Sequence, residues 1–190
     1  MSEPVLPLGG AVFEGLIEIR EMGPQGMVTL RGDMESEDMR AAASEVIGVP
    51  MPEMRGVNRA DDRSLLWMSP DELLVLLPYR QAAGLVADLT GALSGHHTLA
   101  LDVSDARALF RLRGSQLRDV LAKVTPIDTA RDALPEWELR RTRFAQVAAG
   151  VWLTDPSTAQ VFCFRSVAGY VFELLRTVAD PDSAVGFHAI

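Results

Sequence analysis

The residues of this 190-residue chain that could do chemistry are few and scattered. Two pairs of acids stand out: Asp61 and Asp62 in a polar stretch, and Asp102 and Asp105 in "LDVSDAR". Paired carboxylates serve as general acid and base when both reach the same reacting group. Adjacent side chains rarely converge in this way, so we expect Asp61 and Asp62 to lie in a solvated loop. For Asp102 and Asp105 we favour a turn in which the carboxylates accept hydrogen bonds from nearby groups and Ser104 bonds to the backbone.

Metal or thiol chemistry would have to draw on three histidines and one cysteine. His96 and His97 are adjacent, so on a strand their side chains point to opposite faces, and His188 is distant in sequence. Cys163 lies in the apolar run "QVFCFR", which favours a buried structural thiol over a nucleophile. The sequence contains no glycine-rich dinucleotide fingerprint, P-loop, zinc-protease motif, C-x-x-C or nucleophile elbow. We therefore expect no catalytic residue, no cofactor-binding residue and no metal ligand in this chain.

Composition and charge narrow the class of protein. The chain carries a formal net charge of −8, which argues against a nucleic-acid partner because an acidic surface repels phosphates. The arginine-rich stretch "ELRRTR" (138–143) is short and favours a solvated face, with contact to an acidic partner protein as the alternative. No apolar run is long enough for a transmembrane span, and "MSEPVLPLGG" does not resemble a secretory signal. We expect a cytoplasmic protein.

The first half of the chain predicts the order strand, helix, strand, strand, helix, strand. "MVTLRG" (27–32) is typical of a strand, and a helix over 36–47 is expected, with Ser36 as N-cap and Gly48 as its end. "SLLWMSPDELLVLLP" (64–78) predicts two strands joined by a turn at Pro70 and Asp71. A helix over 79–93 and a strand over 97–103 complete the split-βαβ, ferredoxin-like order.

The second half repeats much of this order. A strand over 107–114 precedes a helix over 115–124 with Ser115 as N-cap. Strands over 143–153 and 160–166 flank a turn at Asp155 and Pro156, and a helix over 167–178 follows. We expect Trp67 and Trp152 to occupy comparable core positions, each just before its hairpin turn.

The tripeptide "LRG" marks the repeat most directly. It ends the first strand of each half, at Gly32 and at Gly114, 82 residues apart. Glycine at this point lets the backbone turn sharply and the following helix start close to the sheet. Arg31 and Arg113 are expected to be exposed strand residues. The fold class is therefore α+β, with two tandem ferredoxin-like (β-α-β-β-α-β) units sharing one body.

These units divide the chain into four segments. We expect an N-terminal arm over residues 1–26, a first unit over 27–103, a second over 104–180 and a C-terminal tail over 181–190. Within the arm, "VFEGLIEI" (12–19) could pair as an edge strand or form a short helix.

Four blocks, "LLWMSPDELLVLLP", "LDVSDARALFRLRGSQLRDVLAKVTPID", "RTRFAQVAAGVWL" and "FCFRSVAGYVFELL", resemble the gamma subunit of heterotetrameric sarcosine oxidase. That subunit is itself similar to the folate-binding region of the glycine-cleavage T-protein, an aminomethyltransferase, so the resemblance implies an aminomethyltransferase folate-binding-domain-like fold. It implies alpha, beta and delta partner subunits in a complex that converts sarcosine to glycine. The one-carbon unit goes to tetrahydrofolate or leaves as formaldehyde, and oxygen becomes hydrogen peroxide. By the same resemblance, FAD, FMN, NAD and tetrahydrofolate belong to the partner subunits.

The T-protein carries a glycine-rich turn with two aspartates between two strands. The corresponding stretch here, "GVWLTDPSTAQVFCF", has only Asp155, followed by Pro156, and no glycine pair. We therefore expect a non-catalytic subunit that supports assembly of a sarcosine oxidase, with no cofactor of its own. The alternatives are a stand-alone folate-binding aminomethyltransferase-like protein and a scaffold for a different flavin amine oxidase.

Overall fold

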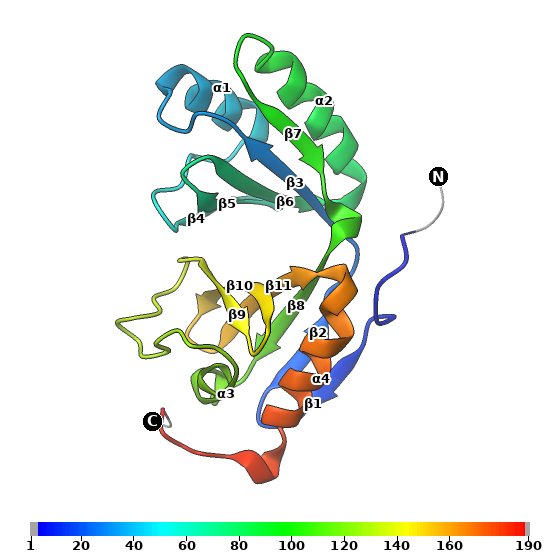
Figure 1. Cartoon of the computed structure of the whole chain (residues 1–190), viewed down its shortest axis with the longest axis vertical. Coiled ribbons are helices and arrows are strands. Elements are labelled where there is room, and N and C mark those ends of the chain that lie inside the picture. Colours follow the sequence, from blue (N-terminus) through cyan, green and yellow to red (C-terminus); the bar gives the residue numbers. More distant parts are fainter. Residues whose placement is uncertain (1–3, 189–190) are drawn as a thin grey trace. The chain divides into compact units, whose positions relative to one another are not determined.

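The strands of the chain form two separate sheets, one in each of two compact units (Figure 1). The computed structural model describes residues 4–188. The middle unit runs from Pro24 to Ser104, and the outer unit combines the chain up to Gly23 with the chain from Asp105 onward. Across the described residues, no helix is long and apolar enough to cross a membrane.

The middle unit has the β-α-β-β-α-β order predicted for it, with one additional short strand. Its sheet has the strand order β4-β5-β6-β3-β7, and all neighbours are antiparallel. Its strands are β3 (Gln25–Arg31), β4 (Val57–Ala60), β5 (Arg63–Ser69), β6 (Glu72–Pro78) and β7 (Leu99–Asp102), and its helices are α1 (Glu37–Ile47) and α2 (Ala82–Ala92). The four strands β5, β6, β3 and β7 with two helices are the ferredoxin-like arrangement.

Alternate side chains along the strands point into the core of the middle unit. Val28 and Leu30 on β3 pack with Met39 of α1 and Leu85 of α2 in one buried cluster. The predicted N-cap of α1 is confirmed, since the hydroxyl of Ser36 accepts a hydrogen bond from the Met39 N–H. The helix ends at Gly48, which has the left-handed φ of 74°.

The outer unit repeats this topology with strands from both ends of the chain. Its sheet has the order β1-β2-β8-β11-β10-β9, again antiparallel throughout. Its elements are β1 (Val12–Glu14), β2 (Glu18–Glu21), β8 (Arg107–Arg113), α3 (Leu117–Val124), β9 (Arg140–Phe144), β10 (Val147–Asp155), β11 (Thr158–Phe164) and α4 (Ala168–Val178). In Figure 1 the blue N-terminal strands lie beside green β8 in the unit that contains orange α4.

The expected N-terminal arm is therefore corrected, because residues 12–21 supply two strands of a sheet. β2 pairs with β8 in the place that β7 takes beside β3. Ile17 and Ile19 are buried in the core of the outer unit, and this burial favours a strand over the alternative helix. Up to residue 188, where the described chain ends, no strand follows α4, and β2 takes that position in the sheet of the outer unit.

The expected N-cap of α3 is also corrected. The helix begins at Leu117 rather than Ser115, and its N-cap is Gln116, which makes no side-chain capping bond. Arg118, on α3, is buried instead of facing solvent, and its guanidinium donates to the carbonyl groups of Thr129, Ala130 and Leu134. The helix thereby holds the long loop that leads to β9.

The registers around the two hairpin turns show which residues of the two units are equivalent. Each has an irregularity in register just before the turn, between Trp67 and Ser69 on β5 and between Leu153 and Asp155 on β10. This alignment matches Trp67 with Leu153, so Trp152 is one position away and the prediction of comparable positions is wrong. A shift of one residue on a strand moves a side chain to the other face of the sheet.

Both "LRG" glycines lie so close to neighbouring residues that a larger side chain would overlap them. A Cβ at Gly32 would lie 2.7 Å from Met39 Cε and 2.9 Å from Thr98 Cγ2, just before β7. A Cβ at Gly114 would lie 2.7 Å from Ile17 Cγ2 and 3.0 Å from Ile17 Cα, just before β2. Thr98 and Ile17 hold equivalent places, since each precedes the strand that pairs with the end of "LRG". In each unit the repeated glycine makes room for the strand that pairs with the end of "LRG", which is β7 in the middle unit and β2 in the outer unit.

We expect Gly114→Ala to destabilise the protein by about 1–3 kcal/mol, because the added methyl group overlaps the backbone and side chain of Ile17. Gly84→Ala is the matched control, since a Cβ at this helical position meets nothing within 4 Å. It should leave stability unchanged or raise it by up to about 1 kcal/mol. Urea unfolding of the wild type and both variants measures these changes. A Gly114→Ala variant as stable as the wild type would contradict the explanation by close contact with Ile17.

Candidate interaction surfaces

The adjacent acids Asp61 and Asp62 form the two-residue turn between β4 and β5. Ala60 and Arg63 are opposite each other in the register, and Asp61 has a left-handed φ of 51°. Aspartate tolerates this conformation better than most residues, which accounts for its place in a tight hairpin. The solvated-loop interpretation of this pair agrees with the turn that is observed.

Of the turn predicted for Asp102 and Asp105, the hydrogen bonds between Asp102 and Ser104 are observed. The Asp102 Oδ1 accepts from the Ser104 backbone N–H at 2.9 Å and from its hydroxyl. The Ser104 Oγ in turn accepts from the Met27 N–H at 2.9 Å, which ties the end of β7 to the start of β3. These contacts give both side chains a structural role at the boundary of the middle unit.

The histidines do not come together. His96 and His97 are exposed and lie in the link between α2 and β7, and the strand predicted from His97 begins only at Leu99. The His188 N–H donates to Asp119 Oδ1 at 2.9 Å, and its Nε2 lies 3.2 Å from Thr129 Oγ1. Within residues 4–188, no group of three or more His, Cys, Asp or Glu residues is placed to hold a metal ion.

Cys163 lies in the core of the outer unit, as its apolar surroundings indicate. It is 2% exposed, and burial raises the pKa of its thiol to about 12. A thiolate is the reactive form of cysteine, so this environment suppresses nucleophilic chemistry near neutral pH.

A carboxylate with two arginine partners joins β2 to β8 in the outer unit. Arg111 Nη2 donates to Glu18 Oε1 at 2.7 Å, and Arg20 Nη2 donates to Glu18 Oε2 at 3.2 Å. These hydrogen bonds, with Arg111 contributing most, lower the pKa of Glu18 from 4.5 to about 2. Sequence reasoning missed this site because Glu18 and Arg111 are 93 positions apart, and only the strand register brings them together.

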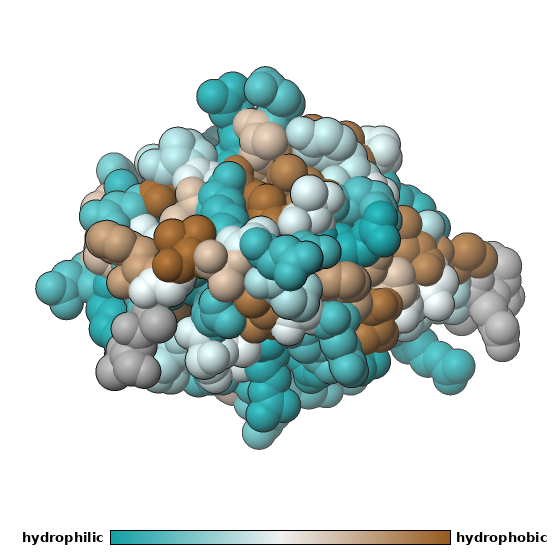
Figure 2. Space-filling model, turned by 90° about the horizontal axis from the view of Figure 1, so that it is seen from below, coloured by the Kyte–Doolittle hydropathy of each residue, from teal (hydrophilic) through white to brown (hydrophobic). Residues whose placement is uncertain are grey.

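Several large apolar side chains remain exposed. On β7, an edge strand, Leu99 and Leu101 are 54% and 52% exposed, while Ala100 between them packs toward the core. Figure 2 shows apolar residues interrupting the hydrophilic surface at several places on one side of the molecule. The exposed large apolar residues are Val5, Val12, Met54, Leu99, Leu101, Phe164, Tyr170, Val185 and Phe187. Single exposed apolar residues are ordinary on protein surfaces, but Leu99 and Leu101 lie on the same side of one edge strand, which suits contact with another chain.

The residues after α4 are held against α3 by polar contacts. Lys123 Nζ donates to the carbonyl groups of Val178 at 2.9 Å and Ser183 at 2.6 Å. Together with the His188–Asp119 bond, these contacts fix the path of the segment. Phe187 nevertheless stays 81% exposed. An aromatic side chain displayed on a fixed backbone suits recognition by another chain.

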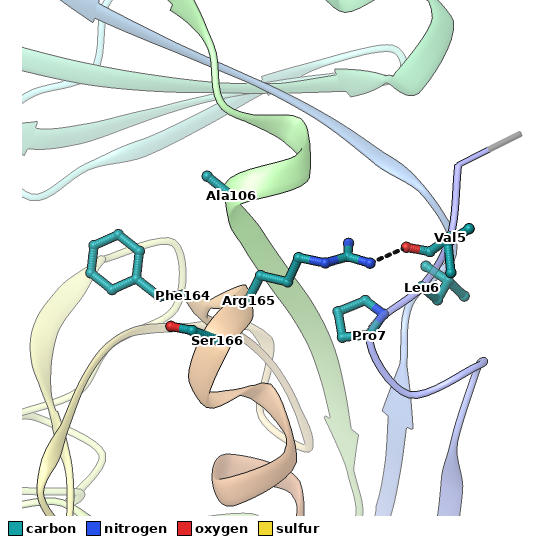
Figure 3. Close-up of a pocket in the computed structure, with 7 residues that line it drawn as sticks. All are labelled: Val5, Leu6, Pro7, Ala106, Phe164, Arg165 and Ser166. Atoms are coloured by element: carbon teal, nitrogen blue, oxygen red, sulfur yellow. Dashed lines mark hydrogen bonds between the residues drawn. The ribbon is translucent and has the colours of Figure 1, made fainter. Parts of the chain in front are cut away.

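One open pocket of about 640 Å³ lies within the outer unit (Figure 3). Arg165 extends from the short turn before α4 toward the N-terminal segment and donates to the carbonyl of Val5. The residues that line the pocket are Val5, Leu6, Pro7, Ala106, Phe164, Arg165 and Ser166. Figure 3 shows the ring of Phe164 pointing away from Arg165, so the two sides of the pocket differ in chemistry.

Comparison with known proteins identifies the family. The sequence model of the sarcosine oxidase gamma subunit family matches residues 31–180, which is most of the chain. The chain belongs to the sarcosine oxidase gamma subunit family. A curated sarcosine oxidase subunit gamma from Arthrobacter sp is 26% identical over 176 residues, covering 90% of this chain and 85% of that protein.

Two solved structures share the fold of this gamma subunit family member. A chain of the heterotetrameric sarcosine oxidase from Corynebacterium sp. U-96 has a TM-score of 0.84 at 22% identity, covering 96% of this chain and 97% of its own. The glycine cleavage system aminomethyltransferase T from Bartonella henselae has a TM-score of 0.60 at 13% identity. That match covers 82% of this chain and 44% of the aminomethyltransferase. The predicted family and the predicted aminomethyltransferase-like α+β fold are confirmed.

In this gamma subunit family member, Asp155 is used by its own turn. Its Oδ1 accepts from the Ser157 backbone N–H and from the Ser157 hydroxyl, each at 2.9 Å. The bond from the Ser157 backbone is the largest cause that lowers the pKa of Asp155. The carboxylate is therefore stabilised in its ionised form as a turn-forming group.

We expect Glu18→Gln to destabilise the protein most above pH 4.5. The bound carboxylate has a pKa of about 2 in the folded chain against an ordinary 4.5, so its stabilisation is present above 4.5 and is lost as the pH falls toward about 2. Urea unfolding of both proteins across this pH range measures the difference. Glu173→Gln is the control, because both members of the Glu173–Arg176 pair are more than half exposed. If the stability difference between the wild type and Glu18→Gln does not change with pH, the lowered pKa of Glu18 is contradicted.

We expect Cys163 to resist alkylation in the folded protein and to react after unfolding, because the thiol is buried and its raised pKa leaves almost no thiolate near pH 8. Mass spectrometry after iodoacetamide treatment with and without urea compares the two states. Rapid labelling of the native chain would show that the thiol is accessible.

Proposed function

We propose that this chain is the non-catalytic gamma subunit of a heterotetrameric sarcosine oxidase and that it supports assembly of the complex. The match of the gamma subunit family to residues 31–180 carries the proposal. Three acids that could have done acid–base chemistry also support the proposal. Asp102 and Asp155 accept hydrogen bonds within their own turns, and Asp61 takes the left-handed position of a hairpin turn. The raised pKa of Cys163 points the same way, since a buried neutral thiol is a poor nucleophile.

The partners in this proposal are the alpha, beta and delta subunits of sarcosine oxidase. In the overall reaction, the N-methyl group of sarcosine loses two electrons, and oxygen takes them up as hydrogen peroxide. The one-carbon unit is transferred to tetrahydrofolate and glycine is released. FAD, FMN, NAD and tetrahydrofolate bind to the partner subunits, and this chain contributes no cofactor. The place of action is the cytoplasm.

The physical contribution of such a subunit is contact area. Stable subunit interfaces contain apolar anchors that lose water on binding, surrounded by polar groups. The exposed Leu99 and Leu101 on the edge of β7 and the displayed Phe187 are anchors of this kind. The leucines lie on backbone held by a sheet and Phe187 on backbone held by a partly buried hydrogen bond, so little conformational entropy is lost when a partner binds.

Co-expression with the alpha, beta and delta chains tests the proposal. The expected result is a single complex on size exclusion that contains this chain and oxidises sarcosine. The chain purified alone should show neither flavin absorbance nor sarcosine-dependent oxygen uptake. Titration with tetrahydrofolate separates the aminomethyltransferase-like alternative, since micromolar binding to the isolated chain would contradict a purely assembling role.

A further inference from the structure

β7 is a free edge of the sheet of the middle unit. It pairs with β3 on one side, and among residues 4–188 no strand pairs with its other side. The Val103 N–H donates to the Met27 carbonyl at 2.8 Å, and in an antiparallel ladder every second residue faces the partner strand. Ala100 and Asp102 alternate with Val103, so their N–H and C=O groups point to the open edge.

The side chains of β7 leave apolar surface along this edge. Leu99 and Leu101 are 54% and 52% exposed. Ala100, between them, packs toward the core of the middle unit, where α2 packs on β7 (Figure 1). The two leucines therefore lie together on the other face of the sheet. Charged side chains often protect an edge strand from pairing with other chains, and the two leucine positions lack that protection.

The outer unit shows what covers the equivalent edge. When the two "LRG" strands are aligned, β7 corresponds to β2 and Asp102 corresponds to Glu21. The Glu21 N–H donates to the carbonyl of Ala11 at 2.9 Å, just before β1, and β1 pairs with β2 in antiparallel register. An added strand thus satisfies, in the outer unit, backbone groups of the kind that stay open in the middle unit.

The side chains at the equivalent positions differ in chemistry. Glu18 and Arg20 of β2 occupy the positions of Leu99 and Leu101. Arg20 donates to Glu18 at 3.2 Å, and Arg111 of β8 donates to the same carboxylate at 2.7 Å. The leucines have no polar group that can bond in this way. What they offer is apolar area, which is stabilising only when another chain covers it.

We propose that β7 binds an extended strand of a partner subunit, which adds to the sheet of the middle unit as β1 adds to that of the outer unit. The inference rests on the proposed function, because it names a contact through which an assembling subunit meets its partner. The added strand bonds to the open backbone groups of Ala100 and Asp102 and places apolar side chains beside Leu99 and Leu101. In this mode of recognition, main-chain hydrogen bonds give affinity and alternate side chains give specificity.

A second copy of this chain fits the edge less well. Pairing of two β7 strands across a two-fold axis adds only the four residues of each strand. Each copy carries a net charge of −8, so two copies repel each other. The proposed complex also contains one copy of each subunit, and a partner subunit is therefore the occupant that it supplies.

A contact through the leucine side chains alone is a rival explanation, and it gives a different result. Such a contact leaves the outward N–H groups of Ala100 and Asp102 without a strand to bond to. Strand addition gives these N–H groups hydrogen bonds, and hydrogen-bonded amides exchange slowly with solvent. Amide exchange therefore distinguishes the two kinds of contact.

The first experiment compares hydrogen exchange of the isolated chain with that of the complex formed by co-expression with the alpha, beta and delta subunits. The amides of Ala100 and Asp102 should exchange rapidly in the isolated chain and about tenfold or more slowly in the complex. The amide of Leu101, which faces β3, is the internal control and should be protected in both. Rapid exchange of Ala100 and Asp102 in a complex that contains this chain would contradict strand addition.

The second experiment measures the affinity of variant chains for the same partner subunits. Ala100→Pro removes one open N–H and leaves the bonds to β3 in place, because that N–H faces away from β3. It should weaken binding about tenfold or more. Arg59→Pro is the matched control on β4, the opposite edge of the same sheet. The Gly56 carbonyl faces β5, so the Arg59 N–H faces outward, and this variant should bind within about twofold of the wild type.

A double variant tests the apolar part of the contact. Leu99→Glu with Leu101→Arg gives β7 the residue types that β2 has at the equivalent positions, and the net charge of the chain is unchanged. It should weaken binding about tenfold or more, because two charged side chains would lose water on contact. Both positions are more than half exposed, so the isolated variant should keep its fold. If Ala100→Pro fails to fold in urea unfolding, the double variant and the exchange measurement decide.

The outcomes separate this inference from the proposed function. If the wild-type chain does not join the complex, the proposed function fails. If the wild type joins and the folded variants of β7 join with equal affinity, the proposed function holds and β7 is not the contact. Size exclusion of the isolated wild type covers the remaining case. A dimer that Ala100→Pro dissociates would show that a second copy occupies β7, which overturns the inference.

Discussion

The pairing of β2 with β8 is the contact on which the outer unit depends. It covers one edge of β8, buries Ile17 and Ile19, and brings Glu18 to Arg111 across strands that are far apart in sequence. The Leu16 N–H also donates to the carbonyl of Ala179 at 2.7 Å, which links the start of β2 to the end of α4. Without this strand, the backbone groups along that edge of β8 and the apolar core beneath it would meet water.

The two units use the same topology but leave different surfaces free. In the middle unit, β7 follows α2 directly and remains an edge, so Leu99 and Leu101 are exposed. In the outer unit, the equivalent β2 is covered by β1 and the free edge on the other side is β9. An apolar edge in one unit and a basic edge in the other give the chain two chemically distinct surfaces. Surfaces of different chemistry suit a subunit that meets more than one partner.

Carboxylates that looked capable of acid–base chemistry are used for local structure. Asp102 and Asp155 both accept hydrogen bonds from a serine two residues later, and Asp61 adopts the left-handed conformation of a hairpin turn. Each contact lies within a few residues, so the sequence pattern was sufficient to predict it for Asp102. The buried carboxylate of Glu21 had no such signal. It accepts from the N–H groups of Leu8 and Gly10, and so orders part of the segment that was predicted to be an N-terminal arm.

The sequence by itself determined the elements that depend on local patterns: the helices, the hairpin turns at Pro70 and Pro156, the repeated order of strands and the family. Alternation, capping residues and turn residues act over short stretches, so they can be recognised without knowing the fold. Only the tertiary structure decided that residues 12–21 complete the second sheet, that Arg118 is buried and that Gly114 makes room for Ile17. It also decided that β7 stays a free edge while β1 covers β2. These features depend on strand register between distant segments, where a shift of one residue would reverse every side chain.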